Sequence, residues 1–371
     1  MNEGIEKELT FSEFLPVSKS DWINKVNKEL KNRPLSELDW KPFPGDDDFE
    51  LNPYYDAEDT GELAYLKAYH NSKAGSSNGW INYVKIKVGE EASARNIALD
   101  YIAQGATGVI FELDRPCSFD QLLKGLPEAN TEISFIAENY PGFPDDYGDY
   151  LNRMVTAAGP PSGFIRTDMI TGLQILTSGK NVVEKRVLFL QADVVLNPFE
   201  ELYAILRQAL KIMEAGLDAG LQPKNLSGQY FIISNTGLDY FIEIAKLRAL
   251  RILFRAFVSA YGVTGNKIKD VYILSVSQKW INDTYAPHEN MLKNTSTALS
   301  AIIGGCNGLL IESENEEPLS RRIALNVSTI IKEESYLDKV SDPAAGSYFI
   351  DRVTHQLIKE TWNRFTKNTG K

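Results

Sequence analysis

The feature that most constrains this chain is an alternation of strand and helix that repeats eight times between residues 80 and 371. Runs of β-branched and aromatic residues predict strands at 80–88, 107–113, 132–138, 162–168, 186–195, 228–234, 270–276 and 308–313. Segments of helical period follow these runs, most clearly at 199–219, 238–261, 288–303 and 318–339. Eight such units predict an α/β fold, a (β/α)8 TIM barrel, and a doubly wound open sheet is the alternative.

The first 79 residues have a different character. Residues 18–31 predict one amphipathic helix, with Trp22 on its apolar face and Ser20 or Asp21 as its cap. The stretches after it, 33–60 and 70–79, are rich in Pro, Gly, Asp and aromatic residues, which predicts an extended arm and a linker. We therefore expect an N-terminal unit at 1–79, which serves subunit association, and a barrel at 80–371.

The arm carries more large aromatic side chains than a free tail would keep in water. They are Trp22, Trp40, Phe43, Tyr54 and Tyr55. Each contributes roughly 2 kcal/mol when fully buried. We expect these side chains to form an interface with a partner chain, because the linker lets the arm leave its own barrel.

Composition excludes several classes of protein. The net charge of −11 leaves no basic face for nucleic acid. Two distant cysteines, Cys117 and Cys306, give neither a disulfide framework nor paired zinc ligands, which favours the reducing cytoplasm. The N-terminus lacks an apolar signal region, and no run of about 18 apolar residues predicts a membrane span.

The residues offer no self-evident catalytic set. The histidines, His70, His288 and His355, have no metal-ligand spacing. His288 begins the helix at 288–303 and could face the barrel mouth, although a surface histidine is favoured. The glycines of 304–308 indicate a helix end rather than a phosphate loop, and Cys306 has no basic neighbour to activate it.

Four segments match a known pattern in order and spacing. In residues 277–313 the matching residues are Trp280, Tyr285, Pro287, Asn290, Ala298, Ala301, Gly304 and Gly305. Residues 38–60, 239–254 and 321–351 match three further stretches of that pattern. In these segments the chain resembles the methylmalonyl-CoA mutase family. The resemblance implies a (β/α)8 barrel that holds acyl-CoA along its axis.

The chain departs from this family where catalysis is expected. Phe189 and Leu190 occupy the place of a Tyr-His pair that follows the family's fifth strand, and the cobalt-ligating Asp-x-His-x-x-Gly motif is absent. We expect both apolar residues to pack inward and narrow the axis. By family position, the residues expected to face substrate are Asn82, Gln278, Trp280 and Asn290.

The resemblance implies the small, non-catalytic subunit of a heterodimeric methylmalonyl-CoA mutase, which interconverts methylmalonyl-CoA and succinyl-CoA. Its large subunit would bind adenosylcobalamin, and no cofactor or metal is expected on this chain. An isolated chain is expected to fold its arm back or to form a homodimer. Two alternatives stay open: an active split-type acyl-CoA mutase with a separate cobalamin-binding chain, and a binding protein built on a degenerate barrel.

Overall fold

The computed structural model of the chain has two compact units, Met1–Glu62 and Leu63–Lys371, and each is described by itself. The predicted boundary at 79 lies within the second unit. The residues that the structure describes are 17–31, 33–39, 49–61, 63, 65–66, 69, 79–127, 130–153, 162–178, 185–192, 197–265, 270–278, 289–315 and 317–369.

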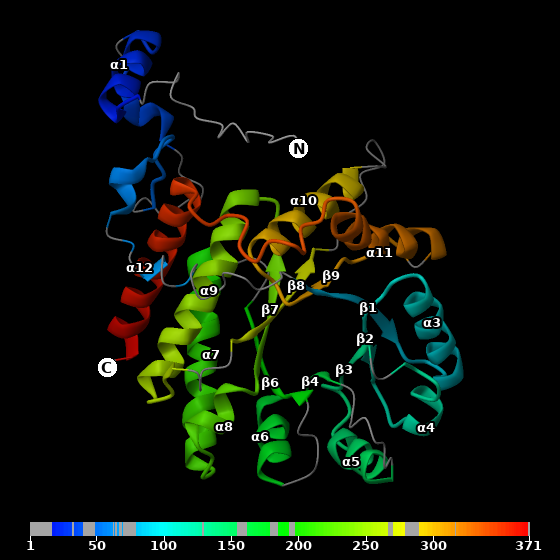
Figure 1. Cartoon of the computed structure of the whole chain (residues 1–371). Coiled ribbons are helices and arrows are strands. Elements are labelled where there is room, and N and C mark those ends of the chain that lie inside the picture. The colour runs from blue at the N-terminus through cyan, green and yellow to red at the C-terminus, as the bar shows by residue number, and fades with distance from the viewer. Residues whose placement is uncertain are drawn as a thin grey trace, which may run out of the picture. The chain divides into compact units, whose positions relative to one another are not determined.

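The second unit is a barrel of parallel strands (Figure 1). Its strands are β1 (Ile81–Lys87), β2 (Gly108–Glu112), β3 (Glu132–Ile136), β4 (Gly163–Arg166), β5 (Lys185–Arg186), β6 (Leu188–Gln191), β7 (Tyr230–Thr236), β8 (Tyr272–Ser277) and β9 (Gly308–Leu310). β5 pairs with β4, whereas β6 pairs with β7. Because only Val187 separates β5 from β6, residues 185–191 join the two sides of the sheet and bring it close to a closed barrel.

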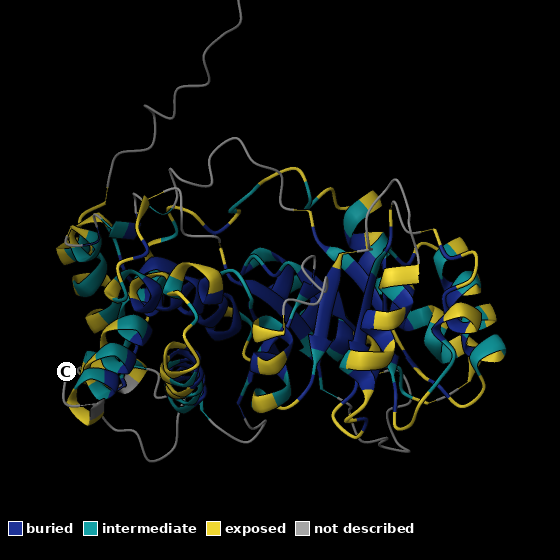
Figure 2. Cartoon of the chain, turned by 90° about the horizontal axis from the view of Figure 1, so that it is seen from below, coloured by how far each residue is buried: buried dark blue, intermediate teal, exposed yellow. Residues whose placement is uncertain are grey.

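Helices cover the outside of this barrel, and the strands are buried at its centre (Figure 2). The helices are α3 (Glu91–Ala103), α4 (Phe119–Leu122), α5 (Phe143–Arg153), α6 (Met169–Thr177), α7 (Pro198–Asp218), α8 (Pro223–Ser227), α9 (Tyr240–Ala260), α10 (Glu289–Ile303), α11 (Pro318–Glu333) and α12 (Tyr348–Thr369). All eight predicted strands are present, the fifth as the split pair β5 and β6. The predicted (β/α)8 barrel is therefore confirmed.

The buried face of α10 consists of small residues, among them Thr297 and Ala301, which are fully buried. Met291 and Leu292 lie on the face with the larger apolar side chains, yet they are 44% and 71% exposed. Small side chains let the helix axis approach the barrel closely, so the uncharged stripe is the packing surface. The helix ends at Gly304 and Gly305 as predicted, with φ of +84° at Gly305.

Helix α9 buries three of its basic side chains. Lys246, Arg248 and Arg251 are each less than 5% exposed. Helices α7 and α12 lie beside α9 (Figure 1) and supply part of the partners of these cations. An unpaired charge in such a place would be very costly, so each cation must have its own partners.

Lys246 lies between two carboxylates. Its Nζ is 2.7 Å from Oε2 of Glu201 in α7 and 2.8 Å from Oε2 of Glu243, and it donates to the carbonyl of Asn235 at 2.9 Å. Burial alone would lower the pKa of Lys246, but the two carboxylates raise it above its usual value. Burial raises the pKa of Glu243. The cluster therefore binds α9 to α7 and to the end of β7.

Arg248 and Arg251 tie α9 to other parts of the barrel. Arg248 forms ion pairs with Asp342 and with Asp351 in α12. Arg251 donates to the carbonyl of Val271 at 2.9 Å and to Oδ1 of Asn307 at 2.9 Å, at the start of β8 and β9. These bonds fix α9 against α12 and against the amino-terminal ends of strands β8 and β9.

The N-terminal unit contains α1 (Lys19–Glu29) and two short 3-10 turns, Leu35–Leu38 and Ala57–Thr60. The cap of α1 is Ser18, not Ser20 or Asp21: its hydroxyl accepts from the backbone N–H of Asp21, which is the third residue of a capping box. The ring of Trp22 stacks on Tyr54 at 4.8 Å. Lys19 pairs with Asp59 at 2.6 Å, so α1 is held to residues 52–60.

Replacing Lys246 with methionine should leave Glu201 and Glu243 buried without a cation. At pH 7 we expect unfolding to cost roughly 3 to 5 kcal/mol less than in the wild type. Burial would then hold the folded-state pKa of Glu243 above its unfolded value. The resulting loss of stability is absent below the unfolded pKa and grows as pH rises. The deficit in urea denaturation should therefore shrink below about pH 5. Lys211→Met, at an exposed position of α7, is the matched control.

Candidate functional site

The interior of the barrel is filled by side chains. The buried cluster inside it consists of Tyr83, Ile110, Phe164, Phe231, Ile233, Tyr272, Leu274 and Leu310. The rings of Phe164 and Phe231 stack with centroids 4.7 Å apart, and Phe189 packs against Phe231 at 5.7 Å. These aromatic rings come from strands β4, β6 and β7, so they meet across the axis and close it.

The amino-terminal end of the interior is closed by a tyrosine pair. The hydroxyls of Tyr83 and Tyr272 lie 2.9 Å apart, and both donate to Oε2 of Glu132. Gly108 and Gly308 make room for the Tyr83 ring, because a Cβ atom there would lie 2.4 Å and 2.6 Å from ring carbons. Burial, followed by the groups around each hydroxyl, raises the pKa of both tyrosines well above the usual value.

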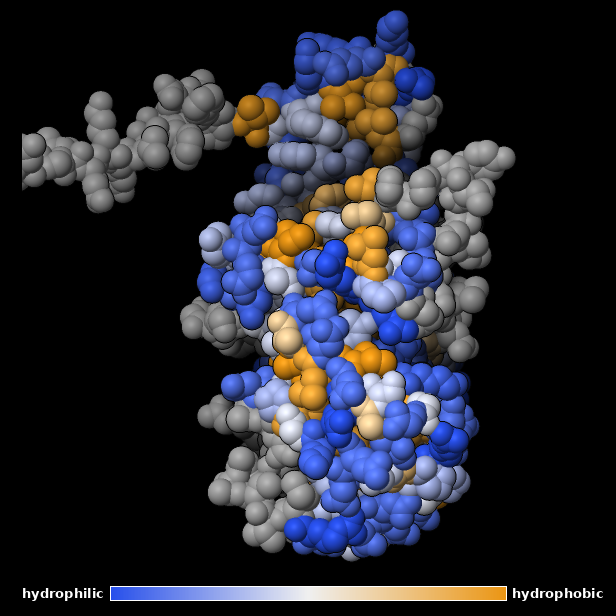
Figure 3. All heavy atoms as spheres, turned by 90° about the vertical axis from the view of Figure 1, so that its right-hand side faces the viewer, coloured by the Kyte–Doolittle hydropathy of each residue, from blue (hydrophilic) through white to orange (hydrophobic). Residues whose placement is uncertain are grey.

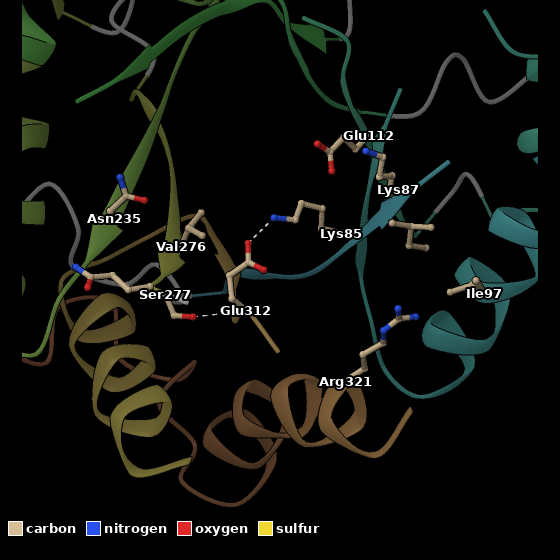
Figure 4. A pocket seen from close by; sticks show the side chains of 11 residues that line it. Lys85, Lys87, Ile97, Glu112, Asn235, Val276, Ser277, Glu312 and Arg321 are labelled. Carbon is tan, nitrogen blue, oxygen red and sulfur yellow. Dashed lines mark hydrogen bonds and ion pairs between the residues drawn. The ribbon is translucent and has the colours of Figure 1, made fainter. Parts of the chain in front are cut away.

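The carboxyl end of the barrel holds a cavity of about 590 Å³ (Figure 4). This is the end at which barrel proteins place their functional residues. Its lining residues are Lys85, Ile86, Lys87, Ile97, Glu112, Asn235, Val276, Ser277, Gln278, Glu312 and Arg321. They come from the ends of β1, β2, β7 and β8, from the segment after β9, and from α3 and α11.

One ion pair lies on the wall of this cavity, between β1 and the segment after its neighbouring strand β9. The Nζ of Lys85 lies 2.5 Å from Oε1 of Glu312, and Figure 4 shows the two side chains extended toward each other. The backbone of Glu312 is held on both sides: its N–H donates to Oγ of Ser277 at 2.9 Å, and its carbonyl accepts from Nδ2 of Asn294 at 3.4 Å. The Glu312 carboxylate is therefore a fixed anion inside the cavity.

The residues predicted to face substrate are not all brought together. Gln278 lines the cavity. Asn82 turns its side chain outward and donates to the carbonyl of Leu325 in α11 at 3.3 Å, so this geometry gives no support for contact with a substrate. Asn290 is buried and donates to Glu314 at 3.1 Å. Trp280 lies outside the described residues.

Phe189 and Leu190 separate, because successive side chains of a strand point to opposite faces. Phe189 packs against the interior cluster, with the Arg166 guanidinium 4.4 Å from its ring centre. Leu190 is fully buried but is not part of that cluster. The expectation that both residues narrow the axis is therefore correct for Phe189 and wrong for Leu190.

The other candidates supply no reactive group in the described residues. His355 lies in α12, where its Nδ1 is hydrogen-bonded to the hydroxyl of Tyr65 at 2.9 Å. His70 and His288 lie outside the described residues. Cys306 is buried, and burial raises its pKa to about 12, which disfavours the reactive thiolate form. Among the described residues, no three His, Cys, Asp or Glu side chains gather to hold a metal, and no helix could cross a membrane.

Sequence reasoning missed the charged residues of the mouth. Lys85 and Lys87 alternate at the end of β1, and Glu112 is the last residue of β2. That position in a strand is a usable signal, since the carboxyl ends of parallel strands meet at one rim. Glu312 and Arg321 follow β9, so their approach to Lys85 depends on the pairing of β1 with β9.

Comparisons with known proteins now bear on this geometry. Residues 196–369 match the family model described as methylmalonyl-CoA mutase. This match covers slightly less than half of the chain. The small subunit of methylmalonyl-CoA mutase from Porphyromonas gingivalis is 27% identical over 97% of this chain, in agreement with the resemblance found in the sequence. The chain spans 64% of that relative.

The large subunit from Porphyromonas gingivalis is 28% identical, over 44% of this chain and 23% of its own length. This organism thus has both a small and a large subunit that resemble the chain. Among solved structures, Yersinia pestis dihydropteroate synthase aligns with a TM-score of 0.41 and 10% identity, over 70% of this chain and 94% of that one. A similarity this low supports no inference about function.

The tyrosine pair predicts a loss of stability in alkali. Tyrosines ionise near pH 10 in the unfolded chain, whereas Tyr83 and Tyr272 stay protonated in the fold. Their contribution is therefore complete below about pH 10 and is lost as pH rises further. In urea denaturation, Tyr83→Phe should reduce the slope of stability against pH above 10. An equal slope in the variant would contradict this assignment, and Tyr336→Phe, at an exposed site, is the control.

Proposed function

We propose that this chain is the small, structural subunit of a heterodimeric methylmalonyl-CoA mutase in the cytoplasm. The complex interconverts methylmalonyl-CoA and succinyl-CoA, and its large subunit performs the reaction. The relationship to proteins named small subunit supports this proposal. The two described cysteines are free, in keeping with a reducing compartment.

The observation that carries the proposal is the closed axis of the barrel. A barrel that holds an acyl-CoA lengthwise needs an open path between its two ends. Here the path is occupied by Phe164 and Phe231 in the middle and by Tyr83 at the amino-terminal end. The cavity at the mouth stops above these rings, so substrate could not lie along the axis of this chain.

The described residues also do not fit the cobalamin group that the family implies. A nitrogen ligand for cobalt would have to come from histidine. Among the described residues the histidine is His355, which lies in the outer helix α12 and is hydrogen-bonded to Tyr65. The charged groups at the mouth include the Lys85–Glu312 ion pair, which offers no nitrogen ligand for cobalt. We therefore assign adenosylcobalamin, which supplies the radical chemistry, to the large subunit and derive no step through it on this chain.

A turnover measurement tests the proposal. The chain alone, supplied with adenosylcobalamin and methylmalonyl-CoA, should form no succinyl-CoA, and the complex with a large subunit should form it. In the complex, Phe231→Ala should leave kcat unchanged within about twofold, because the interior of this chain holds no substrate. Turnover by the chain alone, or loss of a large part of kcat in a folded Phe231→Ala complex, would rule out the structural role.

We also propose that the N-terminal unit is the surface that meets the large subunit. Trp22 and Tyr54 remain partly exposed although they stack on each other, and Val17 is 70% exposed. Tyr55 is already buried in the single chain, where its hydroxyl accepts from the N–H of Asn52. Trp40 and Phe43 lie outside the described residues. Among the described residues of the predicted interface, Trp22 and Tyr54 are therefore the ones whose apolar surface is still accessible to a partner.

Deletion of residues 1–62 should leave a folded barrel that no longer co-purifies with the large subunit. A point variant, Trp22→Ala, should weaken the complex by at least tenfold, because aromatic residues dominate protein interfaces. Lys25→Ala, on an exposed part of α1, is the control. Unchanged affinity of both the deletion and Trp22→Ala would show that the interface lies elsewhere.

A further inference from the structure

A second cavity adjoins the mouth of the barrel. It measures about 580 Å³, lies between α3 and α11, and shares Ile97 and Arg321 with the mouth cavity. Arg321 thus stands between the inside of the mouth and the outer wall. Each space is large enough for a small organic molecule. Neither cavity is lined by the rings that close the barrel axis.

Charge distinguishes these cavities from the rest of the molecule. Their lining includes four cationic side chains, Lys85, Lys87, Arg321 and Arg322, and three carboxylates, Asp100, Glu112 and Glu312. The whole chain has a net charge of −11. Asp114 pairs with Lys87 at 2.9 Å, so these cavities are close to neutral in a chain that is acidic as a whole. An anionic ligand therefore meets less repulsion here than elsewhere on the molecule.

The outer cavity adds an apolar wall to these charges. Ile97 and Tyr101 of α3 face Pro318 and Leu319 of α11 across it, and Leu319 is 58% exposed. Figure 3 shows the side of the molecule that carries α3 and α11, where apolar side chains form small patches among hydrophilic ones. A hydrocarbon chain placed here would cover apolar surface that now faces water.

The ion pair of Lys85 and Glu312 shows which group a bound anion would displace, namely the Glu312 carboxylate. Glu312 presents its carboxylate to Lys85 from a backbone that Ser277 and Asn294 hold in place. A carboxylate is thus already accommodated beside Lys85, as a built-in counter-ion. A ligand carboxylate would find the same geometry and would compete with Glu312 for the ammonium group.

We propose that the two cavities form a binding site for a small amphipathic carboxylate. The head group lies between Lys85 and Arg321, and the hydrocarbon tail lies between Ile97 and Leu319. The ion pair of Lys85 and Glu312 opens when the ligand binds and closes when it leaves. This site goes beyond the proposed structural role, because it gives the small subunit a ligand of its own.

Isothermal titration calorimetry of the whole chain with octanoate and acetate tests the proposal. Octanoate should bind at least tenfold more tightly than acetate, because only octanoate has a tail, and its affinity should fall with added salt. Glu312→Gln should bind octanoate several-fold more tightly, since the competing anion is gone. Arg321→Met should bind it at least tenfold more weakly, and Leu319→Asn should lose affinity for octanoate but not for acetate.

Two controls complete the experiment. Lys124→Met removes an exposed lysine that lines neither cavity and should leave binding unchanged. 1-Heptanol, which has the same alkyl group as octanoate without the charge, should bind at least tenfold more weakly than octanoate. Equal affinity for octanoate and acetate, or no gain in the folded Glu312→Gln variant, would overturn the proposal. Because binding is measured without turnover, either result leaves the test of the structural role independent.

Discussion

Helix α9 carries three basic side chains into the interior, and the arrangement of the elements around it follows from the need to neutralise them. Lys246 requires the carboxylates of Glu201 and Glu243, and Arg248 requires Asp342 and Asp351. Removing one member of such a group leaves a buried charge, which costs more than the pair contributes. The positions of α7 and α12 beside α9 are therefore fixed by charge as well as by apolar packing.

The pattern of the strands was readable from the sequence because buried parallel strands appear as continuous apolar runs, and β7 with its Tyr-Phe-Ile-Ile core is one of these. The division of the fifth predicted strand into β5 and β6 could not be predicted from the sequence. β5 pairs with one neighbour and β6 with the other, and the change at Val187 arises from closure of the sheet. The local sequence of residues 185–191 does not indicate that the strand changes its pairing partner at this point.

The helix faces and the site show where sequence reasoning stopped. In α10, Met291 fits an apolar face by period, but the barrel selects the smaller side chains, which pack at a shorter distance. In α9, Lys246 reads as a surface residue until the distant Glu201 is placed beside it. The same holds for the mouth, where Lys85 and Glu312 meet through the pairing of β1 with β9. In each case the deciding partner is far away in the chain.

The filled interior of the barrel stabilises the fold but leaves no room for a ligand along the axis. The inward positions of a barrel can either bury large side chains, which stabilises the fold, or leave room for a ligand. In this chain the inward positions are filled by large side chains, because apolar contacts across the axis are made by Phe164, Phe189 and Phe231. Opening a lengthwise channel would remove these contacts and leave a cavity in the core. The charged side chains that line the cavity lie at the mouth, where they reach water and cost less than they would among these rings.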